Sequence, residues 1–598
     1  MATSTKPSAA PLPWHWAWLS IAVLVALGYL FQLGGDHIPR NGDELVYAHI
    51  ARLTAESGHW LPLVSSYDFM RNTKPPLLFW QAMMAGGWGD HWTLLNLRLP
   101  SVMYLWATAL MVGLMTWKII TTREQTKAQE SGEATNGRYA ISMGAIAAII
   151  FLSFFSTYRY GRPYLTSAPE TFWLCSVFFA LAWSPSRLMA SRWKFPLLAG
   201  LVIGVGCLYK SFAMVAPVGL GLALCYQMLH ARRAPWQVFR PGIVGDGIKV
   251  AAICVIALGV FGLWFALDPL PGEVWREFVV GENAGKFKSS PGYLKTAFSG
   301  SGGVLVILTG YFVNAGLLFP LSVGCAWTAW RCYRADHGNP TPRQKTSDAE
   351  KVMWLWLLAV ALVFMLPSQR SARYLIPAMP AVAVLIALYW QRTPRIWFSL
   401  TLVFCALGAF AIALIGRGAV QAVGDPAIYS PFFWALLALV VVASLLGISK
   451  RAWTKPITAV NGFGFLLVLA WVTAPFNGPI GQFSPQAKAL VRGQQVRVPN
   501  NFNGQFERYQ FLLTGAEVLA YDAPQPVDYA DTDTLLKTSR FALVQRRAGQ
   551  APCRQCRIID VRWDIRSRQD PKEGAFAALT SPSNFWYSRE YLVERAQP

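Results

Sequence analysis

The fold is decided by stretches such as PFFWALLALVVVASLLGIS at residues 431–449 and IKVAAICVIALGVFGLWFALD at residues 248–268. The first of these carries no charged residue along its whole length. A helix needs about 20 predominantly apolar residues to cross a bilayer. Comparable stretches recur along the chain and predict thirteen spans, near residues 14–33, 96–117, 140–156, 167–184, 196–209, 211–229, 248–268, 302–330, 352–367, 374–390, 396–416, 431–449 and 456–475.

The composition of the chain supports this interpretation. Of 598 residues, 54% are apolar and only 14% are charged, whereas about a quarter of a soluble domain is charged. This excludes a soluble globular protein, a disordered chain and a small disulfide-rich domain. The formal charge is +22, but residues 476–598 hold only 16 basic against 12 acidic residues. The remaining excess lies among the apolar stretches, which favours a membrane protein over a nucleic-acid-binding protein.

The basic loops predict the orientation. The segments 118–139, 185–195, 230–249, 331–351, 391–395 and 450–455 are rich in Lys and Arg, and short loops of this kind stay in the cytoplasm. All six fall on one side if the N-terminus is cytoplasmic, with the first span as an uncleaved anchor. We therefore expect a bacterial inner-membrane protein whose long loops, 34–95 and 269–301, and whose C-terminal domain lie in the periplasm.

The chain divides into two predicted domains, a membrane domain at residues 1–475 and a periplasmic domain at residues 476–598. The second contains strand-like runs at 495–498 and 541–544 with a helical stretch at 506–513 between them, which predicts a small α/β domain. Its two cysteines, Cys553 and Cys556, have C-x-x-C spacing and no second pair for a zinc ribbon. An oxidising periplasm favours a disulfide between them over free thiols.

The first long loop opens with Asn-Gly-Asp-Glu-Leu-Val-Tyr at residues 41–47. Asp43 and Tyr47 are four residues apart and share one face of a helix. An acidic residue here also suits a helix N-terminus, both as a cap and through the helix dipole. Spacing alone leaves the capping and functional interpretations of Asp43 equally open.

A set of basic residues lies on the predicted outer side, against the usual bias. Lys74 precedes two prolines, which bar a helix through it and can begin the next one. The cations are either anchors for lipid headgroups or ligands that converge on one anionic group. We favour convergence for Lys74, Lys210 and Arg373, and headgroup anchoring for Arg162 and Lys288.

A second outer carboxylate, Glu170, enters the fourth predicted span after Pro169. A carboxylate at the mouth of a membrane helix is costly unless it is paired or functional, although it also suits a helix start. Two carboxylates with nearby cations suit a transfer reaction. One carboxylate can deprotonate a hydroxyl nucleophile while the cations stabilise a phosphate leaving group.

These residues resemble those of a known family. The patterns are Asp43-Glu44-x-x-Tyr47-Ala48-x-x-Ala51-Arg52, Lys74-Pro75-Pro76, Asn96-x-Arg98-Leu99-Pro100-Ser101, Leu208-Tyr209-Lys210-Ser211 and Ser371-Ala372-Arg373-Tyr374-Leu375-Ile376-Pro377. They look like the lipid A aminoarabinose transferases, which are similar in turn to protein O-mannosyltransferases. The resemblance covers most of residues 1–475. It implies the GT-C fold, with about thirteen transmembrane helices, and a polyprenyl-phosphate sugar donor on the periplasmic side.

The resemblance also implies roles for individual residues. Asp43 matches the essential first-loop aspartate, and Glu170 stands where many members have a second one. Lys74 matches a ligand of the donor phosphate, and Lys286 replaces what is often Arg near the same group. Tyr47 and Arg52 are expected to line the cavity.

Two departures from the family concern a metal. Members tend to have Glu before Lys-Pro-Pro, where this chain has Thr73, and a Glu-His segment, where it has Glu282-Asn283. Because those Glu and His positions are associated with a divalent metal, a metal here is possible but lacks its expected ligands. The sequence therefore predicts that a metal is dispensable, and it identifies no other cofactor.

The sequence therefore predicts a multi-pass glycosyltransferase. The donor is a sugar linked to undecaprenyl phosphate, and the acceptor is a lipid such as lipid A, a glycan or a protein at the periplasmic face. No P-loop or dinucleotide fingerprint is present, so ATP and NAD are not expected. The alternatives are a transporter or flippase for a lipid-linked sugar and a membrane scaffold. A transporter is expected to carry ionisable groups at mid-membrane, whereas here they cluster at span ends.

Overall fold

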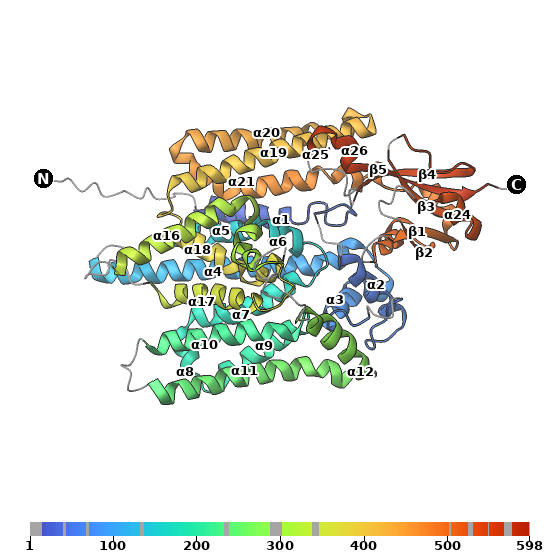
Figure 1. Ribbon diagram of the computed structural model, residues 1–598. Coiled ribbons are helices and arrows are strands. Elements are labelled where there is room, and N and C mark those ends of the chain that lie inside the picture. The colour runs from blue at the N-terminus through green and yellow to red at the C-terminus, as the bar shows by residue number, and fades with distance from the viewer. Residues whose placement is uncertain are drawn as a thin grey trace.

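The computed structural model describes residues 15–39, 43–66, 71–131, 137–231, 239–287, 302–337, 346–500, 504–523, 530–547, 549–566 and 577–596. Figure 1 shows a body of long, roughly parallel helices with a small sheet at one end. The body contains the apolar helices α1 (His15–Gly28), α4 (Leu94–Ser131), α5 (Gly137–Ser153), α6 (Phe155–Gly161), α7 (Ser167–Trp183), α9 (Lys194–Cys207), α10 (Val215–Ala231), α11 (Phe239–Leu267), α16 (Phe319–His337), α17 (Asp348–Phe364), α18 (Met379–Tyr389), α19 (Arg395–Val423), α20 (Pro431–Ser449) and α21 (Arg451–Trp471).

Each predicted span coincides with one or more of these helices, which confirms a mostly helical membrane fold. Among the described residues, seven helices are long and apolar enough to cross a membrane. The number becomes eight if α5 and α6, which meet at a 60° bend, form one span. Others, such as α1 and α9, are apolar but short. The count of thirteen spans stays a prediction.

The helices pack closely where their facing residues are small. On α4 and α5, Gly113 and Gly144 lie opposite each other. A Cβ atom added at Gly144 would come within 2.7 Å of the carbonyl oxygen of Gly113. Small residues allow such backbone contact between membrane helices, where dispersion replaces the hydrophobic effect as the source of attraction.

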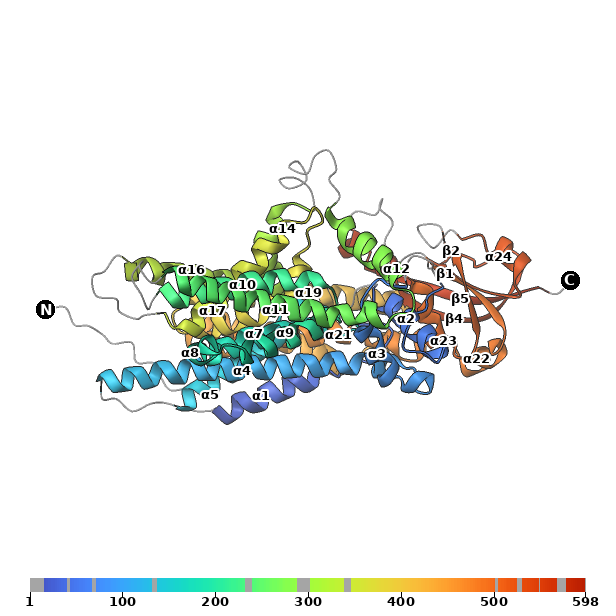
Figure 2. The ribbon, with the colours of Figure 1, turned by 90° about the horizontal axis from the view of Figure 1, so that it is seen from below.

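The predicted outer loops are largely helical. The first contains α2 (Asp43–Glu56), α3 (Pro76–Ala85) and the short turn η1 (Gly87–Gly89). The second contains α12 (Pro271–Val274), the π-helical segment η4 (Trp275–Asn283) and η5 (Ala284–Phe287). Figure 2 shows α2, α3 and α12 at the same end of the body as the sheet.

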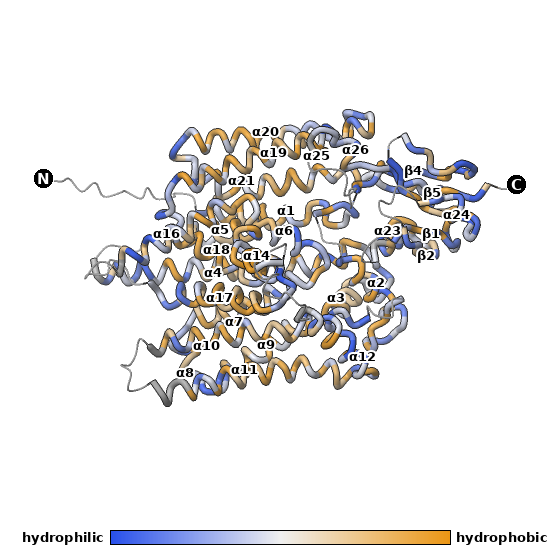
Figure 3. The backbone as a smooth tube through the Cα atoms, viewed as in Figure 1, coloured by the Kyte–Doolittle hydropathy of each residue, from blue (hydrophilic) through white to orange (hydrophobic). Residues whose placement is uncertain are grey.

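Short elements connect these parts. They are α8 (Pro185–Ala190), η2 (Phe212–Met214), α14 (Val304–Leu308), α15 (Gly310–Ala315), η6 (Gly316–Leu318), η7 (Ala372–Ala378), η8 (Pro426–Ile428), η9 (Ala474–Asn477) and η10 (Pro479–Gly481). Hydropathy follows this division, since apolar residues fill the helical body and polar ones gather at its ends and over the sheet (Figure 3).

The C-terminal region is the expected α/β domain. Its five strands are β1 (Gln495–Asn500), β2 (Glu517–Asp522), β3 (Phe541–Arg546), β4 (Cys556–Ile565) and β5 (Tyr587–Arg595), in the order β2-β1-β3-β5-β4. β1 is parallel to β2 and β3, whereas β5 is antiparallel to β3 and β4. The helices are α22 (Pro485–Val491), η11 (Gln505–Glu507), α23 (Arg508–Leu512), α24 (Thr532–Thr538), α25 (Ala577–Thr580) and α26 (Pro582–Trp586). A disulfide joins Cys553 and Cys556, as expected.

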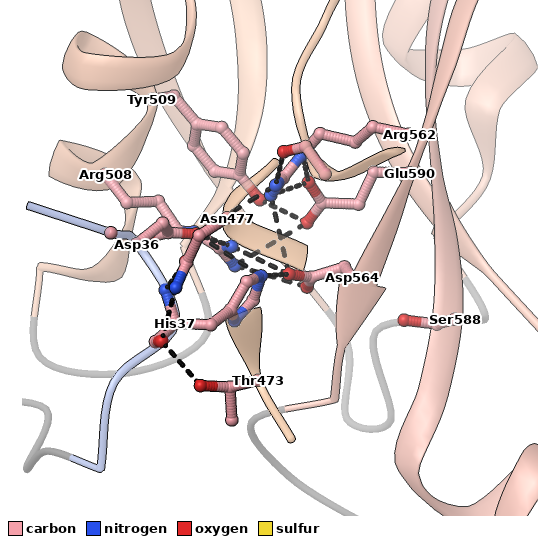
Figure 4. Close-up of polar contacts among 12 residues, drawn as sticks. Asp36, His37, Thr473, Asn477, Arg508, Tyr509, Arg562, Asp564, Ser588 and Glu590 are labelled. Atoms are coloured by element: carbon pink, nitrogen blue, oxygen red, sulfur yellow. Dashed lines mark hydrogen bonds and ion pairs between the residues drawn. The ribbon is translucent and has the colours of Figure 1, made fainter. Parts of the chain in front are cut away.

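A buried ion-pair network fastens this domain to the first loop. It consists of Asp36, Arg508, Arg562, Asp564 and Glu590, each at most 5% exposed. Figure 4 shows the two guanidinium groups between the three carboxylates, with His37 beside them. Arg508 contacts both Asp36, from the first loop, and Asp564, from β4. Burial alone would lower the pKa of Arg508, but these carboxylates raise it well above its usual value.

Candidate functional site

A cavity of about 770 Å³ lies where α10, α11 and α17 meet the two outer loops. Most of its lining is apolar and comes from these helices. The apolar members include Met214, Val215, Ala216, Val250, Leu258, Val279, Val363, Phe364, Leu366 and Pro367. The polar residues of the lining form one group, which consists of Lys74, Lys210, Ser211, Glu282 and Asn283. Hydrogen bonds link Lys74 to Glu282 and Ser211 to Asn283, and the remaining links are between neighbours in the chain. The cavity is therefore amphipathic.

Each of the two lysines stands at a break between helices, and a tertiary contact joins the two breaks. Pro75 caps α3 and Pro76 is its first residue, so Lys74 stands just outside the helix. The chain breaks again between α9 and η2, where Lys210 stands. A backbone hydrogen bond of 3.3 Å from Leu77 to Leu208 joins the two breaks. Both lysines reach the cavity lining as a result.

Each cation in the site has a carboxylate partner. The Lys74 Nζ atom lies 2.9 Å from Glu282, and the Lys210 Nζ atom lies 2.6 Å from Glu170. The Arg373 guanidinium lies 3.4 Å from Asp43. The structure thus brings together Asp43, Glu170, Lys74, Lys210 and Arg373, which form three ion pairs with Glu282 as the sixth member.

The two candidate catalytic carboxylates differ in access. Asp43 is the first residue of α2, and its side chain is 28% exposed. Glu170 is 1% exposed and is held by Lys210. Asp43 is therefore accessible from solvent, whereas Glu170 is enclosed and paired with Lys210.

Tyr47 lies between these pairs, as its four-residue separation from Asp43 predicts. Its ring packs edge-to-face on Tyr164 and lies 5.8 Å from the Lys74 ammonium. Burial raises the pKa of Tyr47 well above its usual value, and the charge of Asp43 adds to this effect while Arg373 opposes it. Tyr47 therefore stays protonated and supports the lysine through its ring.

Comparisons with known proteins bear on the fold. No family model matches the chain. The solved structure of ArnT from Cupriavidus metallidurans bound to undecaprenyl phosphate covers 97% of this chain and 98% of its own, with a TM-score of 0.56 at 15% identity. The apo structure of the same protein gives a TM-score of 0.53. The chain has the GT-C fold.

Sequence relatives lead to the same family. The chain is 25% identical over 383 residues to undecaprenyl phosphate-alpha-4-amino-4-deoxy-L-arabinose arabinosyl transferase 1 of Sodalis glossinidius (strain morsitans). It is 23% identical over 437 residues to the corresponding transferase 2 of Proteus mirabilis (strain HI4320). The matches take in 59% and 70% of the length of these relatives. The resemblance to GT-C membrane glycosyltransferases is confirmed.

Neither of the two predicted cavity residues, Tyr47 and Arg52, is part of the cavity lining, although Tyr47 packs on Lys74, which is. Arg52 does not line the cavity but binds Glu507 of the C-terminal domain, with its Nε atom 2.6 Å from one carboxylate oxygen. Arg52 follows Tyr47 by five positions, and a helix turns about 100° per residue. The two side chains therefore leave α2 on different faces, so Tyr47 meets Lys74 whereas Arg52 meets the C-terminal domain.

Of three further cations, one differs from expectation and two have side chains outside the described part of the chain. Arg162 is not a headgroup anchor. It is fully buried and donates to the backbone carbonyls of Tyr29 and Phe31. The side chains of Lys286 and Lys288 lie outside the part of the chain that the structure describes.

Sequence reasoning missed the role of the acidic residues on the second outer loop. Glu273 pairs with Arg71, Glu277 accepts hydrogen bonds from Asn72, and Glu282 pairs with Lys74. The spacing of the three carboxylates along 273–282 and the polar run at 71–74 were visible in the sequence. Only the fold shows that the two segments face each other.

The residues at this site do not fit a divalent metal. Thr73 supplies its carbonyl oxygen to Lys74, and the side-chain oxygen of Asn283 accepts a hydrogen bond from Ser211. Glu282 is already paired with Lys74. Among the described residues, the one group of His and carboxylate ligands with metal-like spacing is Asp36, His37 and Asp564, which belongs to the buried network.

Proposed function

We propose that this protein is a multi-pass inner-membrane glycosyltransferase. It moves a sugar from a polyprenyl-phosphate donor to a lipid, glycan or protein acceptor at the periplasmic face. The observation that carries the proposal is the amphipathic cavity, whose apolar helical lining ends at Lys74 and Lys210. A polyprenyl phosphate matches this lining, because its long apolar chain suits the helices and its phosphate suits the two lysines. The relatives named for undecaprenyl phosphate, and the neighbour bound to it, support this donor class.

The residues of the site divide the work of transfer. Asp43 accepts the proton of an acceptor hydroxyl, or orients an acceptor phosphate, as the acceptor oxygen forms a bond with the anomeric carbon of the sugar. The bond between that carbon and the phosphate oxygen breaks, and polyprenyl phosphate leaves. Lys74 and Lys210 stabilise the charge that develops on the leaving phosphate. Arg373 holds Asp43 in place, and Glu170 holds Lys210.

In the free protein the three cations are balanced by three carboxylates. A donor phosphate must therefore compete with Glu282 for Lys74 and with Glu170 for Lys210. The side chain of Glu282 is 34% exposed and can turn away, whereas Glu170 is fixed by burial. We infer that Lys74 exchanges its partner on binding and that Lys210 keeps its own.

The arrangement of the polar ends supports the proposed orientation. The C-terminal domain and the outer-loop helices α2, α3 and α12 lie at one end of the helical body, and the basic α8 lies at the other (Figure 1). Short basic loops favour the cytoplasm. The site then faces the periplasm, with the N-terminus in the cytoplasm.

The test is transfer by the purified protein in lipid, with polyprenyl-phosphate sugars as donors and extracted surface glycolipids as acceptors. Mass spectrometry of glycolipids from a deletion strain and its parent selects the sugar and acceptor to use. Release of polyprenyl phosphate together with sugar on the acceptor supports the proposal. Movement of an intact lipid-linked sugar across the bilayer would instead support a transporter, an alternative that the named relatives do not favour.

A further inference from the structure

A second chemically coherent group lies on another face of α2. Ser66, His49 and Glu507 are joined in a line by two hydrogen bonds. The Ser66 Oγ atom lies 2.8 Å from His49 Nε2, and His49 Nδ1 lies 2.9 Å from Glu507 Oε2. The three residues come from the first loop, from α2 and from the C-terminal domain.

The hydrogen bonds define which ring nitrogen of His49 carries the proton. The backbone N–H of Ser66 donates to Nε2 from 3.2 Å, so Nε2 is the unprotonated nitrogen, and its lone pair accepts from both the backbone and the nearer hydroxyl of Ser66. Nδ1 then carries the proton and donates it to Glu507. This is the tautomer in which a histidine can take a proton from a serine hydroxyl while a carboxylate stabilises the resulting charge.

The carboxylate is fixed and ionised. Glu507 is fully buried, and burial alone would raise its pKa. Hydrogen bonds from His49 and Arg52 nevertheless hold the pKa of Glu507 below its ordinary value. Arg52 binds it through two nitrogens, at 2.6 and 3.0 Å. The ring of His49 is packed edge-to-face on Phe506 at 5.1 Å, so both the base and the group that orients it are held in place.

Solvent exposure increases from the carboxylate to the serine, as nucleophilic catalysis requires. Glu507 is 0% and His49 is 4% exposed, whereas Ser66 is exposed. Ser57 provides a comparison within the same loop. It is also exposed, but its hydroxyl donates to the carbonyl of Thr54 at 2.7 Å, and a carbonyl cannot act as a base toward it.

We propose that Ser66 is an activated nucleophile and that Ser66, His49 and Glu507 form an esterase-type triad, separate from the glycosyl-transfer site. The substrate class is a carboxylic ester. His49 Nε2 takes the hydroxyl proton as Ser66 Oγ bonds to the carbonyl carbon. The C–O bond of the ester then breaks, and the alcohol leaves with the proton from His49. Water, deprotonated by the same histidine, releases the acid and restores the serine.

The test uses the purified full-length protein and a fluorophosphonate probe, which phosphonylates an activated serine and loses fluoride. Peptide mapping should find the label on Ser66. Labelling should disappear in Ser66→Ala, persist in Ser57→Ala, and slow by about a hundredfold or more in His49→Gln, the range for loss of a general base. A p-nitrophenyl ester should give a burst of nitrophenol with the parent and none with Ser66→Ala.

Thermal unfolding separates chemistry from folding. Ser66→Ala removes one exposed hydroxyl, so its unfolding temperature should match that of the parent. If the folded parent labels Ser66 no faster than Ser57, the triad is only a docking contact between α2 and the C-terminal domain, and the proposal fails. Glycosyl transfer should be equal in the parent and in Ser66→Ala, so the two activities can fail independently.

Discussion

The cation-lined cavity and the buried network at Asp36 contain similar charges but differ in how those charges are paired. The cavity uses lysines in separate pairs, and the exposed fraction of Lys74 is 14% and that of Lys210 is 19%. The network uses arginines that each bridge several carboxylates, and Arg508 is 3% exposed. Lysine is a compact charge on a flexible stem, whereas the arginine fork holds several acceptors at fixed angles. The first arrangement can exchange a partner for a ligand, and the second can only hold two parts of the chain together.

The largest effect on the transfer rate is expected at Asp43, which is paired with Arg373 beside the cavity. If it is the base, Asp43→Asn keeps the shape but loses the charge, and the transfer rate should fall about a hundredfold to ten-thousandfold. If it only caps α2, Asn is nearly as good a cap and little should change. Turnover by purified protein in lipid decides between the two. Near-normal turnover at unchanged thermal stability would return Asp43 to the capping role.

Arg508→Ala should break the network without touching the cavity. It removes the nearer of the two arginines that Asp36 and Asp564 share and leaves only Arg562, at 3.9 and 3.5 Å. Removing one partner of a buried ion pair costs about 3–5 kcal/mol in other proteins. We expect a lower unfolding temperature and faster proteolysis between the helical body and the C-terminal domain.

The matched control for this variant is Arg540→Ala. Arg540 also pairs with a carboxylate, Glu594, but is 56% exposed, and an exposed pair contributes less than about 1 kcal/mol. Equal losses in the two variants would show that burial does not distinguish the network from ordinary surface pairs.

Lys74→Ala should weaken donor binding as well as rate, because the cation meets phosphate in both the ground and transition states. A hydrogen bond to a charged group contributes about 1.5–3 kcal/mol, which corresponds to an affinity loss of about tenfold to a hundredfold. Titration with undecaprenyl phosphate measures this. Lys118→Ala is the control, since Lys118 packs on Trp183 far along α4 and does not line the cavity. Unchanged affinity in Lys74→Ala would remove the lysine from the phosphate site.

Acid should loosen the contact between α2 and the C-terminal domain. Glu507 has its pKa held below the ordinary value of 4.5. The ionised Glu507 carboxylate therefore contributes fully to the free energy of unfolding above about pH 4.5. This contribution is lost as the pH falls through the pKa that Glu507 has in the folded protein. Glu507→Gln should cost about 2 kcal/mol at pH 7, and the difference in unfolding temperature from the parent should shrink below pH 4.5. A constant difference down to pH 3 would contradict this account.

The smallest effect is expected from a chelator. Thr73 and Asn283 offer neither a carboxylate nor an imidazole, and Arg508 already supplies positive charge to Asp36 and Asp564. Treatment with a chelator should leave both transfer and thermal stability nearly unchanged. Full loss of transfer, restored by zinc or magnesium, would show that other ligands, with Glu282 first among them, hold a metal.

Much of the fold could be predicted from the sequence because its determinants are local. Apolar stretches of sufficient length specify membrane helices wherever they occur. Alternation and turn signals in 495–544 specified β1 and β3, and the C-x-x-C spacing allowed the disulfide. Lys74-Pro75-Pro76 likewise predicted a cation just outside a helix, because proline restricts the backbone at its own position.

The pairing of the charges was decided only by the tertiary structure. Asp43 and Arg373 are 330 positions apart, and Arg52 and Glu507 are 455 apart. No local pattern reports which distant segment will face a given side chain. Arg52 and Tyr47 belong to one motif yet leave α2 on different faces, and Arg162 turned inward to backbone carbonyls. The sequence by itself determined which ionisable side chains are available for catalysis and binding. Their partners and their exposure were decided only by the packing of the helices, because the contacting segments are far apart in the chain.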